Sequence, residues 1–180
     1  MEPTIRVSSP LKGSPASFET ELQKRVYEKL ETLGIDFMRV ENEPAVTMED
    51  CKAIDKAFGN PTVKTVFLTN RQKTALYLYV MPAEKPFITK EFGAALSIPR
   101  VSFASTEMLM DILGTPHGAA SPLSLLTDPE NKVRIILDHE IMEMKRISVT
   151  DTTLHGFISM PPEELRSIFI PSTGHTAEII

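Results

Sequence analysis

Residues 61–80 read PTVKTVFLTNRQKTALYLYV, and this stretch decides the fold. Two runs rich in β-branched and aromatic residues, 63–68 and 75–80, flank the polar stretch 70–73, which opens with Asn. Two such runs joined by a short polar connection are typical of an antiparallel hairpin. The sequence therefore predicts a hairpin at the centre of a sheet.

Lys64 is the unusual residue in the first run. Side chains alternate between the two faces of a strand, so Lys64 shares one face with Val66 and Leu68 while Thr65 takes the other. A lysine beside apolar neighbours costs free energy unless its ammonium reaches water or a bound anion. Two interpretations stay open: a lysine at the sheet margin with its head in solvent, which is the more usual case, or a lysine at the floor of a pocket.

The rest of the chain mixes short strands with short helices. Thr47 is placed to cap a helix, with Asp50 at the capping-box position and Gly59 after the helix end. Apolar spacing and turn residues predict helices over 18–33, 48–58, 89–96, 105–113 and 163–170, and strands over 35–40, 101–103, 123–126, 132–137, 146–149 and 155–159. Because helices and strands do not alternate strictly, we expect the α+β class: a mixed, mostly antiparallel sheet with short helices packed around it.

The length of 180 residues favours one domain with a sizeable core. Residues 1–16 are polar and contain three prolines, so we expect a flexible N-terminal arm, then a single domain over 17–170 and a flexible tail over 171–180. No run approaches the roughly 18 apolar residues of a membrane span, so no membrane partner is expected. Cys51 is the one cysteine, which excludes an internal disulfide and favours the cytoplasm.

Charge is distributed unevenly along the chain. The net charge of −5 argues against a protein that coats nucleic acid, and we expect no DNA partner. Residues 64–100 nevertheless hold six basic and two acidic side chains, a net of +4. A basic region within an acidic protein suits a small anionic contact such as the end of one RNA strand. A chance cluster on a solvated face is the alternative.

Common metal and cofactor motifs are absent from the sequence. No two of the four histidines lie at i, i+4, and neither HExxH nor CxxC occurs, so no metal is expected. The phosphate-binding patterns GxGxxG and GxxxxGK[ST] are also missing, so no nucleotide cofactor is expected. Ser121 lacks the GxSxG context of an activated serine.

The second informative stretch is residues 114–122, GTPHGAASP. Small residues let a ligand approach the backbone closely, and exposed N–H groups bind a carbonyl or an anion. A helix C-cap followed by a tight connection is the alternative interpretation of such a Gly-Pro cluster.

Taken together, these stretches resemble the YbaK/prolyl-tRNA-editing (ProX/PrdX-like) family, the trans-acting relatives of the insertion domain of bacterial prolyl-tRNA synthetases. The likeness runs from about residue 22 to 170. It rests on segments that follow one another in the family's order: EPAVT at 43–47, VKTVFL at 63–68, RVSFAS at 100–105, GTPHGAASP at 114–122, and the closing IS at 158–159 with its helix.

The resemblance assigns roles to particular residues. Lys64 matches the strand lysine that is the family's central functional residue, so we expect it to be catalytic. Substrate-binding residues implied by the resemblance are Thr65, Thr47, His117, Gly118, Ala119, Ala120 and Ser121. His117 lies where the loop varies among relatives. Many relatives with alanyl specificity carry Asn where this chain has Thr65, which keeps open a non-catalytic tRNA or aminoacyl-ligand binding module with the same fold.

The implied reaction is hydrolysis of the ester that joins a wrong amino acid, with alanine expected, to the 3′ end of tRNA(Pro). A synthetase pocket rejects a smaller amino acid poorly, so a second sieve is needed. The expected partner is the 3′ end of aminoacylated tRNA, with prolyl-tRNA synthetase as a second candidate. Lys64 holds the terminal phosphate or ribose, or stabilises charge on the ester oxygen, and both alternatives remain open. No residue stands out as a general base, which leaves water activated by backbone carbonyls or by the substrate's own hydroxyl.

Overall fold

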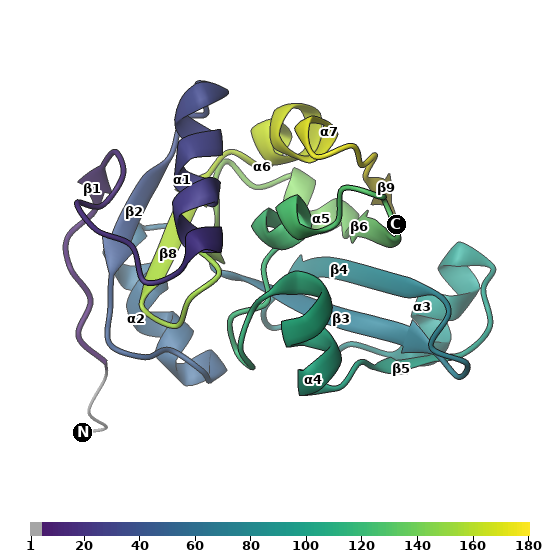
Figure 1. Ribbon diagram of the computed structural model, residues 1–180. Coiled ribbons are helices and arrows are strands. Elements are labelled where there is room, and N and C mark those ends of the chain that lie inside the picture. The colour runs from purple at the N-terminus through teal and green to yellow at the C-terminus, as the bar shows by residue number, and fades with distance from the viewer. Residues whose placement is uncertain (1–4) are drawn as a thin grey trace.

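The computed structural model describes residues 5–180, and its strands form two sheets (Figure 1). The five-stranded sheet has the order β5-β3-β4-β6-β9, built from β5 (Val101–Phe103), β3 (Val63–Asn70), β4 (Leu76–Pro82), β6 (Val133–Leu137) and β9 (Glu178–Ile179). The four-stranded sheet has the order β1-β2-β8-β7, built from β1 (Leu11–Lys12), β2 (Met38–Glu41), β8 (Gly156–Met160) and β7 (Ile147–Thr150). β4–β6 and β6–β9 pair in parallel, and the other strand neighbours are antiparallel.

The predicted hairpin is confirmed and lies at the centre of the larger sheet. β3 and β4 pair from Val63 opposite Pro82 to Thr69 opposite Leu76. In the connecting turn the Asn70 side-chain oxygen accepts hydrogen bonds from the Thr74 and Ala75 amides, at 2.8 and 3.1 Å. The asparagine side chain thus closes the turn locally, as short polar residues do.

Helices cover both sheets. The main segments are α1 (Glu21–Thr32), α2 (Met48–Phe58), α3 (Thr89–Leu96), α4 (Thr106–Met108) continued by η1 (Leu109–Leu113), η2 (Pro122–Thr127), α5 (His139–Met142), and α6 (Pro162–Glu164) continued by η3 (Leu165–Phe169) and α7 (Ile170–Ser172). α1 lies across the four-stranded sheet, whereas α3 lies at the far end of the β3–β4 hairpin (Figure 1). The capping box predicted for α2 is present, with Thr47 as N-cap, Asp50 as its partner and Gly59 at the C-cap.

The two faces of β3 belong to two different apolar clusters. Val63 and Phe67 pack in the larger core, between the sheets and α1, η1 and η2. Leu68 is buried in a smaller cluster with Tyr79 and Phe92 on the opposite face, and Val66 packs against that cluster. The alternation predicted for this strand is therefore confirmed, and it places Lys64 on the face of the smaller cluster.

The predicted α+β class is confirmed. One predicted strand is wrong: residues 123–126 lie inside η2, a 3₁₀ helix that starts at Pro122 after the N-cap Ser121. Leu123 and Leu125 are both fully buried there. A short apolar run buried on all sides has no period to separate helix from strand, and the serine-proline start decides for the helix.

The two terminal segments, for which the sequence predicts a flexible arm and a flexible tail, contact the rest of the fold through strand pairing. β1 pairs with β2, and β9 pairs with β6. His175 is buried, with its Nε2 2.8 Å from Asp128 Oδ2. Each sheet edge offers unpaired N–H and C=O groups that the terminal segments satisfy. Residues 1–4 of the predicted arm lie outside the described residues.

Among residues 5–180, no helix is both long enough and apolar enough to cross a lipid bilayer.

Candidate active site

A cavity of about 530 Å³ lies beside the edge of β3. Four stretches of chain form most of its wall: the start of α2, the first half of β3, the β5–α4 connection, and the loop after η1. The residues that line it are Ala45, Val46, Thr47, Met48, Cys51, Thr62, Val63, Lys64, Thr65, Val66, Phe67, Phe103, Ala104, Ser105, Thr106, Leu109, His117, Gly118, Ala120, Thr150 and Phe157. The cavity thus brings together six of the predicted site residues: Thr47, Lys64, Thr65, His117, Gly118 and Ala120.

The cavity occupies a gap in the pairing of the β3 edge. β5 pairs with β3 only from Leu68 onward, and its last contact is the Ala104 amide, which donates to the Phe67 carbonyl at 2.8 Å. At the other end an isolated bridge joins Thr62 on the same edge to Ser148 of β7. Thr65 lies between these two contacts, so the edge of the strand is open to the cavity.

Lys64 reaches across the face opposite to Thr65. Its ammonium Nζ donates a hydrogen bond of 2.6 Å to the backbone carbonyl of Lys85, and its side chain is half-buried. Burial lowers the pKa of the Lys64 ammonium, because the charged form is the one that loses hydration. The ammonium is therefore not free in solvent, because it is hydrogen-bonded to a main-chain carbonyl of the loop after β4.

The acceptor carbonyl is itself held in place through the side chain of Lys85. Lys85 Nζ contacts Asp138 Oδ2 at 2.8 Å and Glu140 Oε2 at 2.6 Å, and the Tyr79 hydroxyl donates to Asp138 Oδ2 at 2.7 Å. Burial raises the pKa of the Asp138 carboxyl, but the hydrogen bonds from Lys85, the Glu140 amide and Tyr79 outweigh it, and the net pKa is lowered. The loop after β4 is thus tied to the end of β6 by a charged hydrogen-bond network.

The same network contains the one group of side chains with metal-ligand spacing found among residues 5–180. Ligand atoms of Asp138, His139 and Glu140 lie within 4.8 Å of one another. The ammonium of Lys85 already bonds to both carboxylates. A cation there would have to displace that ammonium, so the group is explained by the lysine it holds.

The loop 114–121 closes the cavity with glycine at its closest approach. Gly118 has φ +91°, and a Cβ added there would lie 3.1 Å from Val46 Cγ1 and 3.4 Å from Leu154 Cδ2. Both the backbone conformation and the space favour glycine at this position. The loop therefore sits directly against the start of α2.

Ala119 and Ser121, two of the predicted loop residues, do not line the cavity and instead attach the loop to β7. The Thr150 hydroxyl donates to the Ala119 carbonyl at 2.7 Å, and the Ser121 hydroxyl donates to the Thr150 carbonyl at 2.8 Å. Ala119 and Ser121 are both fully buried. Their role in the structure is to fasten the loop to β7.

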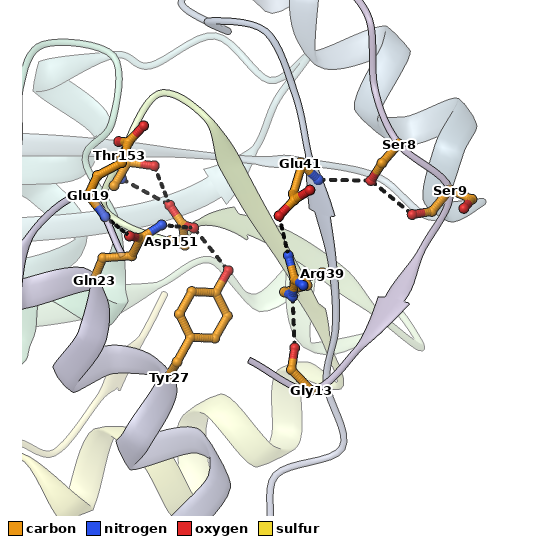
Figure 2. A network of polar contacts seen from close by, with 10 residues as sticks. All are labelled: Ser8, Ser9, Gly13, Glu19, Gln23, Tyr27, Arg39, Glu41, Asp151 and Thr153. Atoms are coloured by element: carbon orange, nitrogen blue, oxygen red, sulfur yellow. Dashed lines mark hydrogen bonds and ion pairs between the residues drawn. The ribbon is translucent and has the colours of Figure 1, made fainter. Parts of the chain in front are cut away.

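The turn that follows β7 is held by a buried carboxylate, shown in Figure 2. Asp151 Oδ2 accepts hydrogen bonds from Gln23 Nε2 and the Tyr27 hydroxyl, both at 2.9 Å, and Oδ1 accepts from the Thr153 amide and hydroxyl. Burial, followed by the neighbouring Asp151 charge, raises the pKa of Tyr27. This turn leads directly to Leu154, which packs against Gly118, so α1 supports the cavity loop from behind.

Thr47 and Cys51 line the cavity from α2. The Thr47 hydroxyl oxygen accepts a hydrogen bond of 3.2 Å from the Asp50 amide and so caps α2. Burial, followed by the charges of Asp55 and Asp50, raises the pKa of the Cys51 thiol to about 11. A raised pKa disfavours the thiolate form near neutral pH, which argues against Cys51 as a nucleophile.

Sequence reasoning missed the apolar part of the cavity wall. Val46, Met48 and Phe103 are exposed by 48, 44 and 62%, unusual for large apolar side chains, and all three line the cavity. Val46 and Phe103 belong to the EPAVT and RVSFAS segments that carried the family resemblance, so that signal was available. Thr150 and Phe157 come from β7 and β8 and had no local signal.

The chemical character of the wall is simple. No Asp or Glu of residues 5–180 lines the cavity, and the titratable groups in it are Lys64, His117 and Cys51. Hydroxyls, main-chain groups and small apolar side chains make up the rest. The cavity suits a small, mostly apolar group bound through main-chain hydrogen bonds next to a single fixed cation.

The chain is similar to known proteins over most of its length. Over 162 residues the chain is 25% identical to the prolyl-tRNA editing protein ProX of Acetoanaerobium sticklandii, covering 90% of this chain and 98% of that protein. It is also 25% identical over 170 residues to prolyl-tRNA synthetase associated domain-containing protein 1 of Danio rerio, covering 93% of this chain and 91% of that protein.

A solved structure described as a candidate trans-editing enzyme for prolyl-tRNA synthetase has the same fold, with a TM-score of 0.63 at 16% identity over 89% of this chain and 96% of its own. The model of the aminoacyl-tRNA editing domain matches residues 42–168, well over half of the chain. The resemblance inferred from the sequence is thereby confirmed, and the chain belongs to the aminoacyl-tRNA editing domain family.

Proposed function

We propose that this protein is a trans-acting deacylase that hydrolyses mischarged tRNA(Pro), with alanine as the amino acid removed. The observation that carries the proposal is the position of Lys64, which lines the cavity and whose ammonium is held by the Lys85 carbonyl. The relative from Acetoanaerobium sticklandii is named as a prolyl-tRNA editing protein, which supports the same substrate class.

The close packing of the loop 114–121 against the start of α2 supports a wall of fixed shape, which a sieve for small amino acids requires. Gly118 and Val46 meet so closely that no room remains for a methyl group between them. We propose that this fixed wall admits alanine and excludes the bulkier ring of proline. Such a second sieve removes the smaller amino acid that a synthetase pocket rejects poorly.

Lys64 serves the reaction as a fixed positive charge. Its ammonium has further N–H donors beyond the one used by the Lys85 carbonyl, and they are available to a phosphate, to a ribose oxygen or to charge that develops on the ester. No carboxylate lines the cavity among residues 5–180, and we assign His117 to substrate binding. We therefore propose that water is activated by a main-chain carbonyl or by the ribose hydroxyl of the substrate. We place this activity in the cytoplasm and keep prolyl-tRNA synthetase as a partner, as the name of the Danio rerio relative supports.

The test is a time course of ester loss from alanyl-, cysteinyl- and prolyl-tRNA(Pro) at saturating protein. We expect alanyl-tRNA(Pro) to decay fastest and prolyl-tRNA(Pro) to decay at the rate seen in buffer. Decay of all three esters at the buffer rate would rule out the deacylase. Tight binding of the charged tRNA in that case would establish the second candidate, a non-catalytic binding module, which the lack of a carboxylate or thiolate in the cavity favours.

A further inference from the structure

We infer that the aminoacyl group docks on the main chain of Thr65, as if it were one residue of an added antiparallel strand. This inference rests on the proposed function and specifies how the site holds its substrate. It assigns the recognition of the amino acid to the Thr65 N–H and C=O groups rather than to a side chain.

The first step is that these two groups point into the cavity. The Ser148 amide donates to the Pro61 carbonyl at 3.0 Å, and the Ala104 amide donates to the Phe67 carbonyl at 2.8 Å, so both carbonyls point away from β4. Successive residues of an antiparallel pair point their N–H and C=O groups alternately toward and away from the partner strand. Thr65 has the same parity as residues 61 and 67, so its N–H and C=O point away from β4, into the gap that neither β5 nor β7 fills.

The second step concerns the charge on the substrate. An aminoacyl ester carries an α-ammonium, and in a partly closed site this group needs hydrogen-bond acceptors. Among residues 5–180, no carboxylate lines the cavity to accept from it. The Thr65 carbonyl is an acceptor at the open edge, and no strand within residues 5–180 pairs with it there.

The third step is the match between the ligand and a strand residue. In a hydrogen-bonded antiparallel pair the two residues exchange both N–H···O bonds. An aminoacyl ester has its ammonium and its acyl carbonyl on one α-carbon, so the ammonium donates to the Thr65 C=O while the acyl oxygen accepts from the Thr65 N–H. Side chains of directly paired residues lie on one face of the sheet, which directs the substrate's methyl group to the face of the Thr65 side chain.

The antiparallel direction also places the rest of the substrate. Beyond its acyl carbon the ligand continues toward the start of β3, which brings the ester oxygen and the ribose opposite Lys64. When water adds to the acyl carbon, the negative charge on the acyl oxygen keeps its hydrogen bond from the Thr65 N–H. The carbon–oxygen bond to the ribose then breaks, the ribose oxygen takes a proton that the water released, and free amino acid leaves. Lys64 and the Thr65 amide thus act on opposite sides of the same ester.

Proline at position 65 provides the test. Proline lacks the N–H but is tolerated in an edge strand where that N–H is not used in the ladder. Thr65→Val, which has lost the hydroxyl and keeps the N–H, is the reference. We expect Thr65→Pro to fold and to hydrolyse alanyl-tRNA(Pro) about 100-fold or more slowly than Thr65→Val in single turnovers, the scale for loss of one oxyanion donor. Val66→Pro, which removes an N–H that points to β4, should instead lower the melting temperature sharply.

Equal rates for Thr65→Pro and Thr65→Val in folded proteins would overturn the inference. If Thr65→Pro does not fold, Thr65 is replaced by the corresponding α-hydroxy acid, which removes the N–H alone. We then expect this variant to hydrolyse alanyl-tRNA(Pro) about 100-fold or more slowly than wild type, and equal rates would overturn the inference. Propionyl-tRNA(Pro), which lacks the amino group, should be cleaved at least about 10-fold more slowly than alanyl-tRNA(Pro).

The wild-type rate tests the proposed function separately. If wild type cleaves no mischarged tRNA(Pro), docking is read instead from the Thr65 amide signal in NMR spectra, with an adenosine that carries alanine through a stable amide as the probe. A shift of that signal supports the docking mode, and an unchanged signal overturns it.

Discussion

The side-chain ammonium of Lys64 and the backbone carbonyl of Lys85 are joined by a hydrogen bond of 2.6 Å. The side chain of Lys85 in turn bonds to Asp138 and Glu140. The two lysines therefore form a chain of contacts. The carboxylates of Asp138 and Glu140 neutralise the charge of Lys85, and the Lys85 carbonyl holds the Lys64 ammonium in place. This arrangement keeps the acidic groups away from the cavity and leaves Lys64 as an uncompensated positive charge beside it.

Removal of the Lys64 ammonium is expected to slow deacylation strongly and to leave the fold intact. Lys64→Ala should melt within a few degrees of wild type or slightly higher, because a partly buried charge is lost. Its single-turnover deacylation rate should fall by about 100-fold or more. Lys64→Arg should also be slow, since a planar guanidinium does not replace a compact ammonium on one carbonyl.

The matched control for Lys64 is Lys132→Ala, an exposed lysine paired with Glu130 outside the cavity. It should leave the rate and the melting temperature near wild type. A folded Lys64→Ala protein that hydrolyses alanyl-tRNA(Pro) at the wild-type rate would remove the residue on which the proposed function rests.

Lys85 is expected to act as a positioning residue for Lys64. Lys85→Met keeps the backbone carbonyl but loses the anchor on Asp138, so the carbonyl is no longer held under Lys64. We expect a loss of about 10- to 100-fold in deacylation, as small displacements of a positioning group produce. Lys85→Arg, which can still reach Asp138, should recover part of the loss.

Selective chemistry on Lys64 separates this effect from a general loss of structure. Brief acetylation followed by mass spectrometry should show faster modification of Lys64 in Lys85→Met and unchanged modification of Lys132. Glu140→Gln removes only the more exposed partner of Lys85 and should have a small effect. Unchanged Lys64 reactivity in Lys85→Met would contradict the positioning role.

Acid stability is expected to depend on Asp138. Its folded-state pKa lies below the ordinary value of about 3.9, so the carboxylate stabilises the fold at pH values above that range. As pH falls through the lowered pKa the carboxylate is protonated and this contribution is lost. We expect wild type to exceed Asp138→Asn in unfolding free energy by about 1–3 kcal/mol near pH 7, the cost of a buried hydrogen-bond partner left unsatisfied.

Denaturant titrations of both proteins from pH 7 to pH 3 provide the measurement. The difference between wild type and Asp138→Asn should shrink only below about pH 4. A difference that already shrinks between pH 7 and pH 5 would mean that the folded-state pKa is raised rather than lowered.

Gly118 is expected to be needed for the shape of the cavity, beyond its backbone conformation. Gly118→Ala places a Cβ 3.1 Å from Val46, whereas Gly174 has a similar φ of +86° with nothing within 4 Å of an added Cβ. Both substitutions should therefore cost about 1–2 kcal/mol in unfolding free energy through backbone strain. Only Gly118→Ala should also slow deacylation, because Val46 and the start of α2 must shift. Equal rates for the two variants would contradict a cavity role for the loop.

Several elements of this protein were determined by local sequence. The period of two along 63–68 predicts both the strand and the face on which Lys64 lies. Thr47, Asp50 and Gly59 mark the two ends of α2, since caps depend on hydrogen bonds within a few residues. The family segments predict the correct family because their order along the chain is itself a sequence property.

The structure departs from the sequence-based expectations at an ambiguous apolar run and at the C-terminal segment. The run 123–126 is a 3₁₀ helix that begins locally, at Pro122 and the N-cap Ser121, and the hydrogen bond from the Ser121 hydroxyl to the Thr150 carbonyl attaches this start to β7. The chain end forms β9 only because β6 presents a free edge to it. No local sequence pattern predicts that Thr150 contacts Ser121 or that β6 pairs with the C-terminal segment.

The site shows the same division. From the sequence alone, Lys64 and the small-residue loop are identifiable, because unusual residues in a strand and in a turn stand out against their neighbours. The carbonyl under the Lys64 ammonium, the Asp138 anchor behind it and the open edge at Thr65 follow from tertiary structure alone. They arise where β5 and β7 leave the same strand at different points, and the course of two strands remote in sequence is decided by packing of the whole core.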